Sequence, residues 1–207
     1  MIRVVDCEQG TPEWFAARSG MATASEFATV MAKGKTGGPS LTRRKYLLTL
    51  AGERLTGECV EPYTNAHMER GKIMEAEARD LYSFKTDNEL SRVGFIVNDS
   101  YRAGVSPDSL IGDDGMLEVK TKLPHLQLEA LIDNVLPTDH KAQCQGALWV
   151  TGRKWLDFVS YWPKLPLLIV RVERDEPYIE NLARAVHEFN TELDAVVARF
   201  TEVAKAA

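Results

Sequence analysis

The sequence predicts a mixed α/β fold in a single domain, residues 1–207, with a central mixed β-sheet flanked by helices. Three observations predict it: apolar residues recur at helical spacing through the first third, short β-rich runs surround a glycine-rich turn in the middle, and a long apolar stripe marks the end. With 207 residues, 44% hydrophobic and 27% charged, the chain is large enough to bury a core of its own.

The first third is predicted to be helical. Thr11 and Pro12 form a helix start, in which an oxygen-bearing N-cap precedes proline at the first helical position, and Gly20 ends that helix. Thr23 and Glu26 have the spacing of a capping box, so a second helix is expected to begin there. The glycine-rich residues 33–39 are expected to form a loop. The predicted helices are residues 12–20, 23–33, 41–56 and 65–84.

The middle of the chain changes to β-type patterning. Two short runs rich in β-branched and aromatic residues come first, and two more flank Gly112-Asp113-Asp114-Gly115, which is a strong hairpin signal. We therefore expect antiparallel strands here. The predicted strands are residues 93–97, 101–105, 109–111 and 116–122.

The last third returns to mixed structure. Helices are expected at residues 125–134 and 139–150, the second capped by Thr138 or Asp139 and ending before Gly152. Two strands follow, residues 155–161 and 167–172. A final helix is expected to start at residues 175–177, and its apolar stripe consists of Ile179, Leu182, Val186, Phe189, Leu193, Val196 and Phe200.

Composition excludes some classes of protein and leaves others open. No run of eighteen apolar residues and no apolar N-terminal segment occurs, so we expect no membrane span or signal peptide and a cytoplasmic protein. Three scattered cysteines argue against a disulfide framework or a zinc knuckle. The net charge of −5 is unlike a non-specific phosphate-binding surface, but carboxylates that bind cations would also produce it.

The segment around the predicted hairpin carries candidate chemistry. Asp108 lies on one strand, and Glu118 and Lys120 lie two residues apart on the other, so these two point to the same face. The hairpin can therefore bring two carboxylates and one ammonium together. Carboxylate oxygens are hard ligands for Mg²⁺, and a neighbouring lysine can orient or deprotonate water or stabilise a phosphodiester transition state. The alternative is that all three are solvated residues on the wet face of an antiparallel sheet.

A wider set of motifs resembles one known family. Pro107-Asp108, Glu118-Val119-Lys120 and the helix around Glu75 together resemble the PD-(D/E)xK nuclease superfamily, with its restriction-endonuclease-like core. More narrowly, the chain resembles the phage lambda exonuclease family, the YqaJ-like viral recombinases, over about residues 6–195. The supporting segments are Glu8-Gln9-Gly10, Trp14 with Arg18, Thr23-Ala24-Ser25-Glu26, Ala142-Gln143-Cys144-Gln145, Trp149-Val150-Thr151 and Glu173-Arg174-Asp175-Glu176.

The resemblance implies a metal centre. It implies that Asp108, Glu118, Glu75 and the Val119 backbone carbonyl hold Mg²⁺, with Mn²⁺ as a substitute, and that Lys120 is the catalytic lysine. The residues alone instead favour Glu75 as a helix-surface carboxylate paired with Arg79 at i,i+4.

The resemblance also implies a pocket for a terminal 5′-phosphate, formed by Arg18, Ser25, Ser106 and Gln143. Their chemistry suits a phosphate, because arginine offers a two-pronged donor and the others add hydroxyl and amide donors. Taken alone, Ser25 is also an ordinary capping residue, and Arg18 and Gln143 are ordinary polar surface residues. The tryptophans are interpreted as packing residues, and the four histidines, which lack metal-ligand spacing, as non-ligands.

Together these features predict a Mg²⁺-dependent alkaline-type exonuclease that digests one strand of linear double-stranded DNA from a 5′-phosphorylated end and leaves a 3′ single-stranded tail. The resemblance further implies a ring-shaped homotrimer and a phage single-strand annealing protein as partner in recombination, with no membrane association. Two alternatives stay open: a structure-specific or restriction-type endonuclease of the same superfamily, and a non-catalytic DNA-binding module on the same fold.

Overall fold

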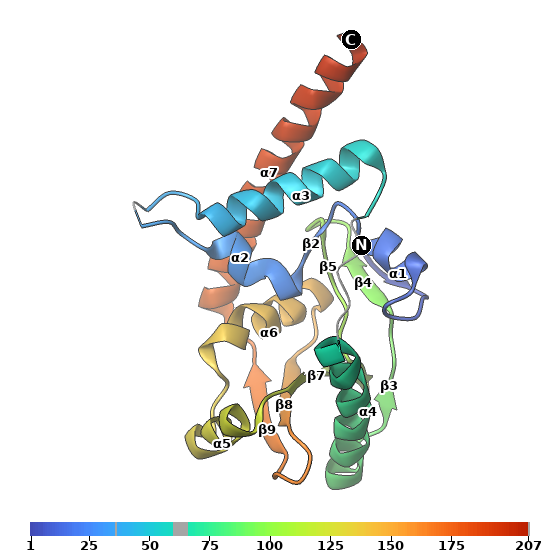
Figure 1. Ribbon diagram of the computed structural model, residues 1–207, viewed down its shortest axis with the longest axis vertical. Coiled ribbons are helices and arrows are strands. Elements are labelled where there is room, and N and C mark those ends of the chain that lie inside the picture. The colour runs from blue at the N-terminus through green and yellow to red at the C-terminus, as the bar shows by residue number, and fades with distance from the viewer. Residues whose placement is uncertain (36, 60–65, 207) are drawn as a thin grey trace.

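The computed structural model describes residues 1–35, 37–59 and 66–206, and the side chains of all of these except 66–69 and 203–206. Helices dominate the N-terminal third, as predicted (Figure 1). The elements there are β1 (Ile2–Val5), α1 (Pro12–Arg18), β2 (Ala22–Thr23), the 3-10 turn η1 (Ala24–Glu26), α2 (Phe27–Met31), α3 (Leu41–Thr56) and α4 (Ala66–Thr86).

The remaining elements form the rest of two sheets and three more helices. The strands are β3 (Leu90–Ser91), β4 (Phe95–Asn98), β5 (Ala103–Val105), β6 (Ser109–Ile111), β7 (Gly115–Thr121), β8 (Trp155–Tyr161) and β9 (Leu168–Glu173). The helices are α5 (Pro124–Asp133), α6 (Thr138–Thr151) and α7 (Glu176–Ala206).

The predicted mixed sheet is the five-stranded sheet β3-β6-β7-β8-β9. Its one parallel pair is β7 with β8, and α5 and α6 connect these two strands. The sheet contains the expected hairpin, because β6 and β7 pair antiparallel with Ser109 opposite Leu117. A second sheet, β1-β4-β5-β2, was not expected as a separate unit.

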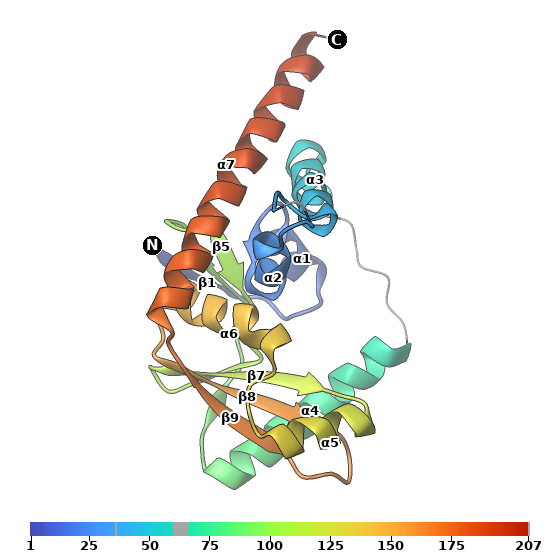
Figure 2. The ribbon, with the colours of Figure 1, turned by 90° about the vertical axis from the view of Figure 1, so that its left-hand side faces the viewer.

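Helices cover the two faces of the five-stranded sheet, as Figure 2 shows for α4 below it and α6 above it. On α4, Met74, Ala78 and Tyr82 are buried one turn apart and pack with Leu117 and Val119 of β7. Side chains alternate along a strand, so the intervening residues of β7 face α6. Met116 accordingly belongs to the main core that α6, α2, α3 and α7 share.

The structure changes the prediction for residues 23–33. A single helix was expected there, but Ala22 and Thr23 pair parallel with Ala103 and Gly104 of β5. The chain then passes through the 3-10 turn before α2 begins at Phe27. Thr23 makes no capping hydrogen bond to the backbone, so the predicted capping box is wrong. Strand pairing with a distant segment has overridden the local signal.

Most helix ends follow local chemistry. Thr11 caps α1 with Pro12 at its first position, and Gly57 and Gly152 end α3 and α6 in the left-handed conformation. The N-cap of α6 is Pro137 rather than the predicted Thr138 or Asp139.

Helix α7 is 31 residues long and its C-terminal end extends beyond α3 (Figures 1 and 2). Its predicted stripe is buried from Ile179 to Leu193, whereas Phe200 is 48% exposed. Ion pairs fasten the middle of α7 to α3, with Arg43 on Glu192 and Arg54 on Asp194. No helix in the described part of the chain combines the length and apolarity needed to cross a bilayer.

Candidate active site

The hairpin of β6 and β7 brings Asp108 and Glu118 together. The Asp108 backbone N–H donates to the carbonyl of Leu117 at 3.2 Å, so Asp108 stands at the point where the ladder with β7 ends. Beyond this point the Asp108 side chain replaces a backbone partner: its Oδ2 accepts a hydrogen bond from the Val119 N–H at 2.6 Å. The chain reaches Asp108 from β5, which belongs to the other sheet. In the described residues, no strand therefore pairs with this edge of β7 beyond Leu117.

The direction of the Val119 carbonyl follows from the hydrogen bond to Asp108. In a strand, the N–H and C=O of one residue point toward the same edge. Since the Val119 N–H points to Asp108, its carbonyl also points to the Asp108 side. The backbone direction is thus compatible with the predicted role of this carbonyl as a metal ligand.

Glu118 and Lys120 share a face of β7, as their spacing predicted. The Lys120 ammonium nitrogen lies 2.7 Å from Glu118 Oε1, and the Glu118 side chain is only 4% exposed. Burial alone would lower the pKa of Lys120, but the carboxylates of Glu118 and Asp108 outweigh it and raise this pKa above its ordinary value. Lys120 is therefore held as an ammonium against the buried carboxylate, which is not the solvated arrangement of a wet sheet face.

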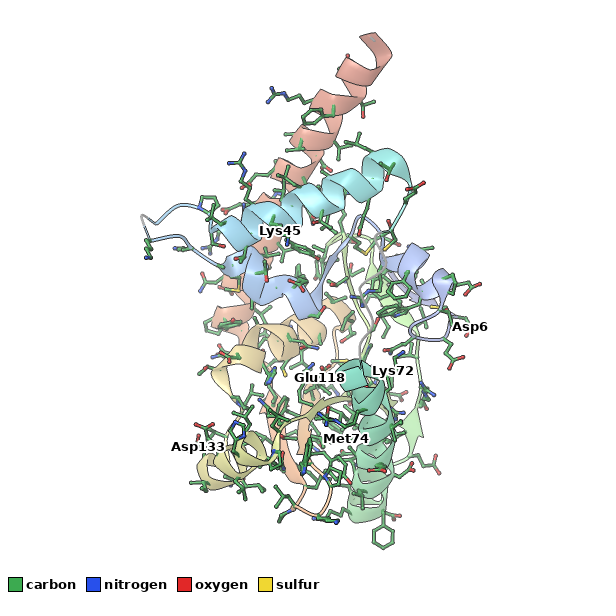
Figure 3. All side chains as sticks on the ribbon, in the orientation of Figure 1. Asp6, Lys45, Lys72, Met74, Glu118 and Asp133 are labelled. Carbon is green, nitrogen blue, oxygen red and sulfur yellow. The ribbon has the colours of Figure 1, made fainter. Side chains whose placement is uncertain are left out.

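Glu75 comes from α4, on the other face of the sheet. Figure 3 shows Glu118 beside the N-terminal part of α4, where Lys72 lies, and α4 contacts β7 along this stretch. Glu75 forms an ion pair with Arg79 one turn later, the arrangement that a helix-surface reading predicted. It is nevertheless close enough to Asp108 to act on it electrostatically. Both readings of Glu75 are thus compatible with the structure.

The carboxylates repel one another across this site. Burial raises the pKa of Asp108 well above its ordinary value, and the charges of Glu118 and Glu75 raise it further. A cation placed among these oxygens would relieve that repulsion, and carboxylate and carbonyl oxygens are the ligands that Mg²⁺ prefers. The donor set therefore fits a hard divalent metal. In the described residues, however, no three acidic, histidine or cysteine side chains converge closely enough to form a complete metal site.

Gln143 lies with the acidic centre in this structure. Its side-chain amide, on α6, donates to Glu118 Oε1 at 2.6 Å. It was predicted to contact a terminal phosphate. The observed bond instead orients Glu118. Its Oε1 atom accepts the Gln143 hydrogen bond and also forms the ion pair with Lys120.

Arg18 and Ser106 do meet, as the predicted phosphate pocket requires. Arg18 donates to Ser106 Oγ at 3.3 Å and stacks over Trp14 with its guanidinium carbon 4.1 Å from the ring centroid. Burial lowers the pKa of Arg18. No carboxylate forms an ion pair with it in the part of the chain that is described. Arg18 is partly buried, so its guanidinium remains available to an anion such as a phosphate.

Trp14 is part of this site, although the sequence favoured a packing role. Its indole N–H donates to Ser106 Oγ at 2.8 Å. Ser25, the fourth predicted phosphate ligand, is exposed and its hydroxyl lies 3.2 Å from that of Thr23. The contact between Trp14 and Ser106 was missed because these residues lie 92 positions apart, and no local sequence pattern predicts such a contact.

A cavity of about 820 Å³ lies between Arg18 and Glu75. Arg18 and Trp14 line it from α1, and Glu75 and Lys72 line it from α4. Its size suits a nucleotide rather than a lone phosphate. One member of the predicted phosphate pocket, Arg18, and one of the predicted metal ligands, Glu75, therefore face the same space.

Among the histidines, His140 serves packing. His140, the one nearest in sequence, stacks on Phe158 with ring centroids 5.0 Å apart. Burial and the charges of Lys122 and Lys120 lower its pKa to about 4. Gln145 is also structural, because its amide bonds the chain between β9 and α7 at Glu173 and Asp175.

Comparison with known proteins identifies close relatives. The family model described as YqaJ-like viral recombinase domain matches residues 13–154. LHK-Exo, an alkaline exonuclease from Laribacter hongkongensis, is 35% identical, and the match covers 95% of this chain and 100% of that chain with a TM-score of 0.85. Its complex with dAMP matches at the same identity and coverage with a TM-score of 0.86.

A more distant structure shares the fold. A phage-related exonuclease from Haemophilus somnus 129PT is 14% identical, and the match covers 87% of this chain and 96% of that one with a TM-score of 0.65. The search of curated proteins found no significant match.

Proposed function

The chain belongs to the YqaJ-like viral recombinase family, and from that premise we propose that it is a Mg²⁺-dependent 5′-to-3′ exonuclease. Its substrate is linear double-stranded DNA with a 5′-phosphorylated end. It digests one strand and leaves a 3′ single-stranded tail for recombination by strand annealing. The full chain, residues 1–207, acts as one exonuclease domain.

One observation carries the proposal: Arg18 and Glu75 line the same cavity. Arg18 is a partly buried cation that forms no ion pair in the described residues, and Glu75 acts electrostatically on Asp108. A terminal phosphate on Arg18 would present the next phosphodiester to the acidic centre. The 35% identical relative is an alkaline exonuclease that has been crystallised with dAMP, a nucleoside monophosphate.

Each residue has a distinct part in the proposed reaction. Asp108, Glu118, Glu75 and the Val119 carbonyl would hold Mg²⁺, which when bound supplies Lewis-acid activation and charge neutralisation at the scissile phosphate. In the metal-free protein the carboxylates of Glu118 and Asp108 raise the pKa of Lys120. With the metal bound, Lys120 would orient or deprotonate the attacking water or stabilise developing negative charge.

The second group of residues binds the DNA end. Arg18, with Ser106 hydrogen-bonded to it, holds the terminal phosphate, and Ser25 lies on the neighbouring segment as a further hydroxyl donor. Gln143 donates a hydrogen bond to Glu118 and so orients it, and we keep it as a candidate contact of the terminal phosphate.

We also propose that the protein assembles as a homotrimeric ring around its DNA and acts with a phage single-strand annealing protein in the bacterial cytoplasm. Membership in a family of viral recombinases supports this. Light scattering of the purified protein should give three times the chain mass of 23.1 kDa. A mass of one chain at working concentration would contradict the ring.

The catalytic assignment is tested by paired lysine substitutions. Lys120→Ala should lower kcat on linear duplex DNA by roughly 10²–10⁴-fold, because it removes the charge beside Glu118. Lys122→Ala is the matched control, since Lys122 is the next cation of the same strand row and forms no ion pair with the acidic centre in the described residues. Equal, small effects of both substitutions on kcat would overturn the catalytic assignment of Lys120. A wild-type protein that does not digest DNA would favour the alternative of a non-catalytic DNA-binding module.

A second substrate distinguishes the endonuclease alternative. The proposed exonuclease needs an end, so covalently closed circular duplex should remain intact under conditions that digest its linear form. Efficient cutting of closed circles would show an endonuclease instead.

A further inference from the structure

The side chain of Gln9 joins two distant segments beside the site. Its amide nitrogen donates to the carbonyl of Val93 at 3.0 Å and to the carbonyl of Pro107 at 2.9 Å. These residues lie 84 and 98 positions away in the sequence. Both protons of the amide are therefore used, and Gln9 fixes the chain before β4 to the chain before β6.

The segment that carries Gln9 has little freedom to move. A Cβ atom on Gly94 would lie only 2.1 Å from the carbonyl oxygen of Cys7. The backbone at Cys7 thus packs directly against the backbone at Gly94, which only glycine allows. Gln9 follows two residues later and is half-buried, so its amide is presented from a fixed position.

The segment that Gln9 holds contains residues from both halves of the site. Ser106 accepts hydrogen bonds from Trp14 and Arg18 on one side of Pro107. Asp108 bonds the Val119 N–H on the other side. Residues 106 and 107 belong to no strand, and proline has no N–H, so the carbonyl is the only backbone hydrogen-bonding group of Pro107. Gln9 supplies the hydrogen bond at that carbonyl.

We propose that Gln9 is a positioning residue for the reaction: it fixes residues 106–108 so that Asp108 stands beside Glu118 while Ser106 stays with Arg18. This inference rests on the proposed exonuclease function. Without the amide, the carbonyls of Val93 and Pro107 lose a donor, and the Asp108 carboxylate and the Ser106 hydroxyl no longer share a fixed frame. A displacement of about 1 Å at a reacting group is enough to slow an enzyme by roughly 100-fold.

The test compares Gln9→Met with Gln127→Met. Methionine has a similar length but donates no hydrogen bond. Gln127 is the matched control, because its amide also donates to two backbone carbonyls, those of Ser160 and Pro166, which lie outside the residues assigned to the site. We measure the Mg²⁺ affinity of each metal-free protein by calorimetry, and kcat and KM on 5′-phosphorylated linear duplex.

Gln9→Met should weaken Mg²⁺ binding several-fold and lower kcat by roughly tenfold to 100-fold. Gln127→Met should lower the unfolding midpoint but leave Mg²⁺ affinity and kcat of the folded protein near wild type. If Gln9→Met does not fold, Gln9→Asn is judged by the same measurements, since its shorter side chain cannot span both carbonyls.

A folded Gln9 variant with wild-type Mg²⁺ affinity and kcat would overturn the positioning role. Failure of the proposed function would look different. In that case the wild-type protein itself would not digest DNA, and the Mg²⁺ affinities would still decide whether Gln9 positions Asp108.

Discussion

Asp108, which we propose as a metal ligand, is expected to destabilise the metal-free protein at neutral pH. Burial and the carboxylates of Glu118 and Glu75 raise its pKa in the folded protein. A carboxyl with a raised folded pKa stabilises the fold below its unfolded pKa, and that stabilisation is lost as the pH rises through the folded pKa. At neutral pH, Asp108→Asn should therefore stabilise the metal-free protein, by roughly 2–4 °C for each 1 kcal/mol of repulsion relieved.

Calorimetric unfolding at pH 7 and pH 3.5 without metal measures this effect. The gain should be present at pH 7 and much smaller at pH 3.5, where Asp108 is protonated in the folded protein and mostly protonated in the unfolded chain. Asp113→Asn, at the exposed hairpin turn, makes the same change in charge and should shift neither midpoint. An Asp108→Asn protein that melts below wild type at pH 7 would show that the carboxylates do not repel.

Arg18 gives the second prediction at the scale of residues. Arg18→Met removes the partly buried cation that we assign to the terminal phosphate. KM for 5′-phosphorylated duplex should rise by roughly 10–100-fold, which corresponds to the loss of one charged hydrogen-bonding group. The same duplex with a 5′-hydroxyl is the internal control, and its KM should hardly change. Equal losses on both substrates would place the phosphate elsewhere.

Sequence patterns predicted these residues unequally. Strand periodicity alone placed Glu118 and Lys120 on one face, and the structure joins them by an ion pair. The contacts of Gln9 and Trp14 with residues 106 and 107 could not be predicted, because they depend on how the two sheets meet. Gln143 bonds Glu118 for the same reason: its helix faces β7 only after the chain has folded.

At the scale of elements, ion pairs connect α3 and α7. Arg43 is 7% exposed and donates to both carboxylate oxygens of Glu192 and to the carbonyl of Val30. Arg43→Ala should destabilise the protein by about 1–3 kcal/mol, less than for a fully buried pair because Glu192 is half exposed. Urea unfolding measures it. As a control, Arg44→Ala at the exposed neighbouring position should change the free energy of unfolding by less than about 0.5 kcal/mol. Similar effects of the two substitutions would show that the Arg43–Glu192 ion pair does not stabilise the fold.

Helix α6 and strand β8 meet at His140, which stacks on Phe158. Burial lowers the pKa of His140 to about 4, from an ordinary value of 6.5. The unfolded chain therefore takes up a proton before the folded protein does, and stability is lost as the pH falls from about 6.5 toward 4. His140→Phe should weaken that loss, measured as the difference in urea midpoint between pH 7 and pH 5. His125→Phe, at an exposed position, should leave the difference unchanged.

Elements were predicted well where local signals control them. The bounds of α3, β6 and β8 follow from apolar period and turn residues, and the structure confirms them. Strands β1 and β3 were missed, because most of their residues are exposed or only partly buried and thus show no alternation. The helix predicted at 23–33 failed because β2 pairs with β5, some eighty residues away.

For the whole molecule, the sequence predicted the mixed α/β class and the five-stranded sheet that carries Asp108 and Glu118. It could not predict the division into two sheets. That division depends on the chain leaving β5 and entering β6 through residues 106–108, and it creates the open edge beside Val119. The net charge of −5 could not predict a DNA partner either, because carboxylates of the acidic centre contribute to it.

We propose above all that the protein digests DNA from a 5′-phosphorylated end, in the 5′-to-3′ direction, and that this digestion depends on Mg²⁺. It is tested most directly with linear duplex DNA labelled at the 5′ end or the 3′ end of the same strand. We predict that the 5′ label is released first as a mononucleotide, while the 3′ label stays on a shortening strand until late in the digestion. Early release of the 3′ label, or release of either label without added divalent metal, would contradict the account.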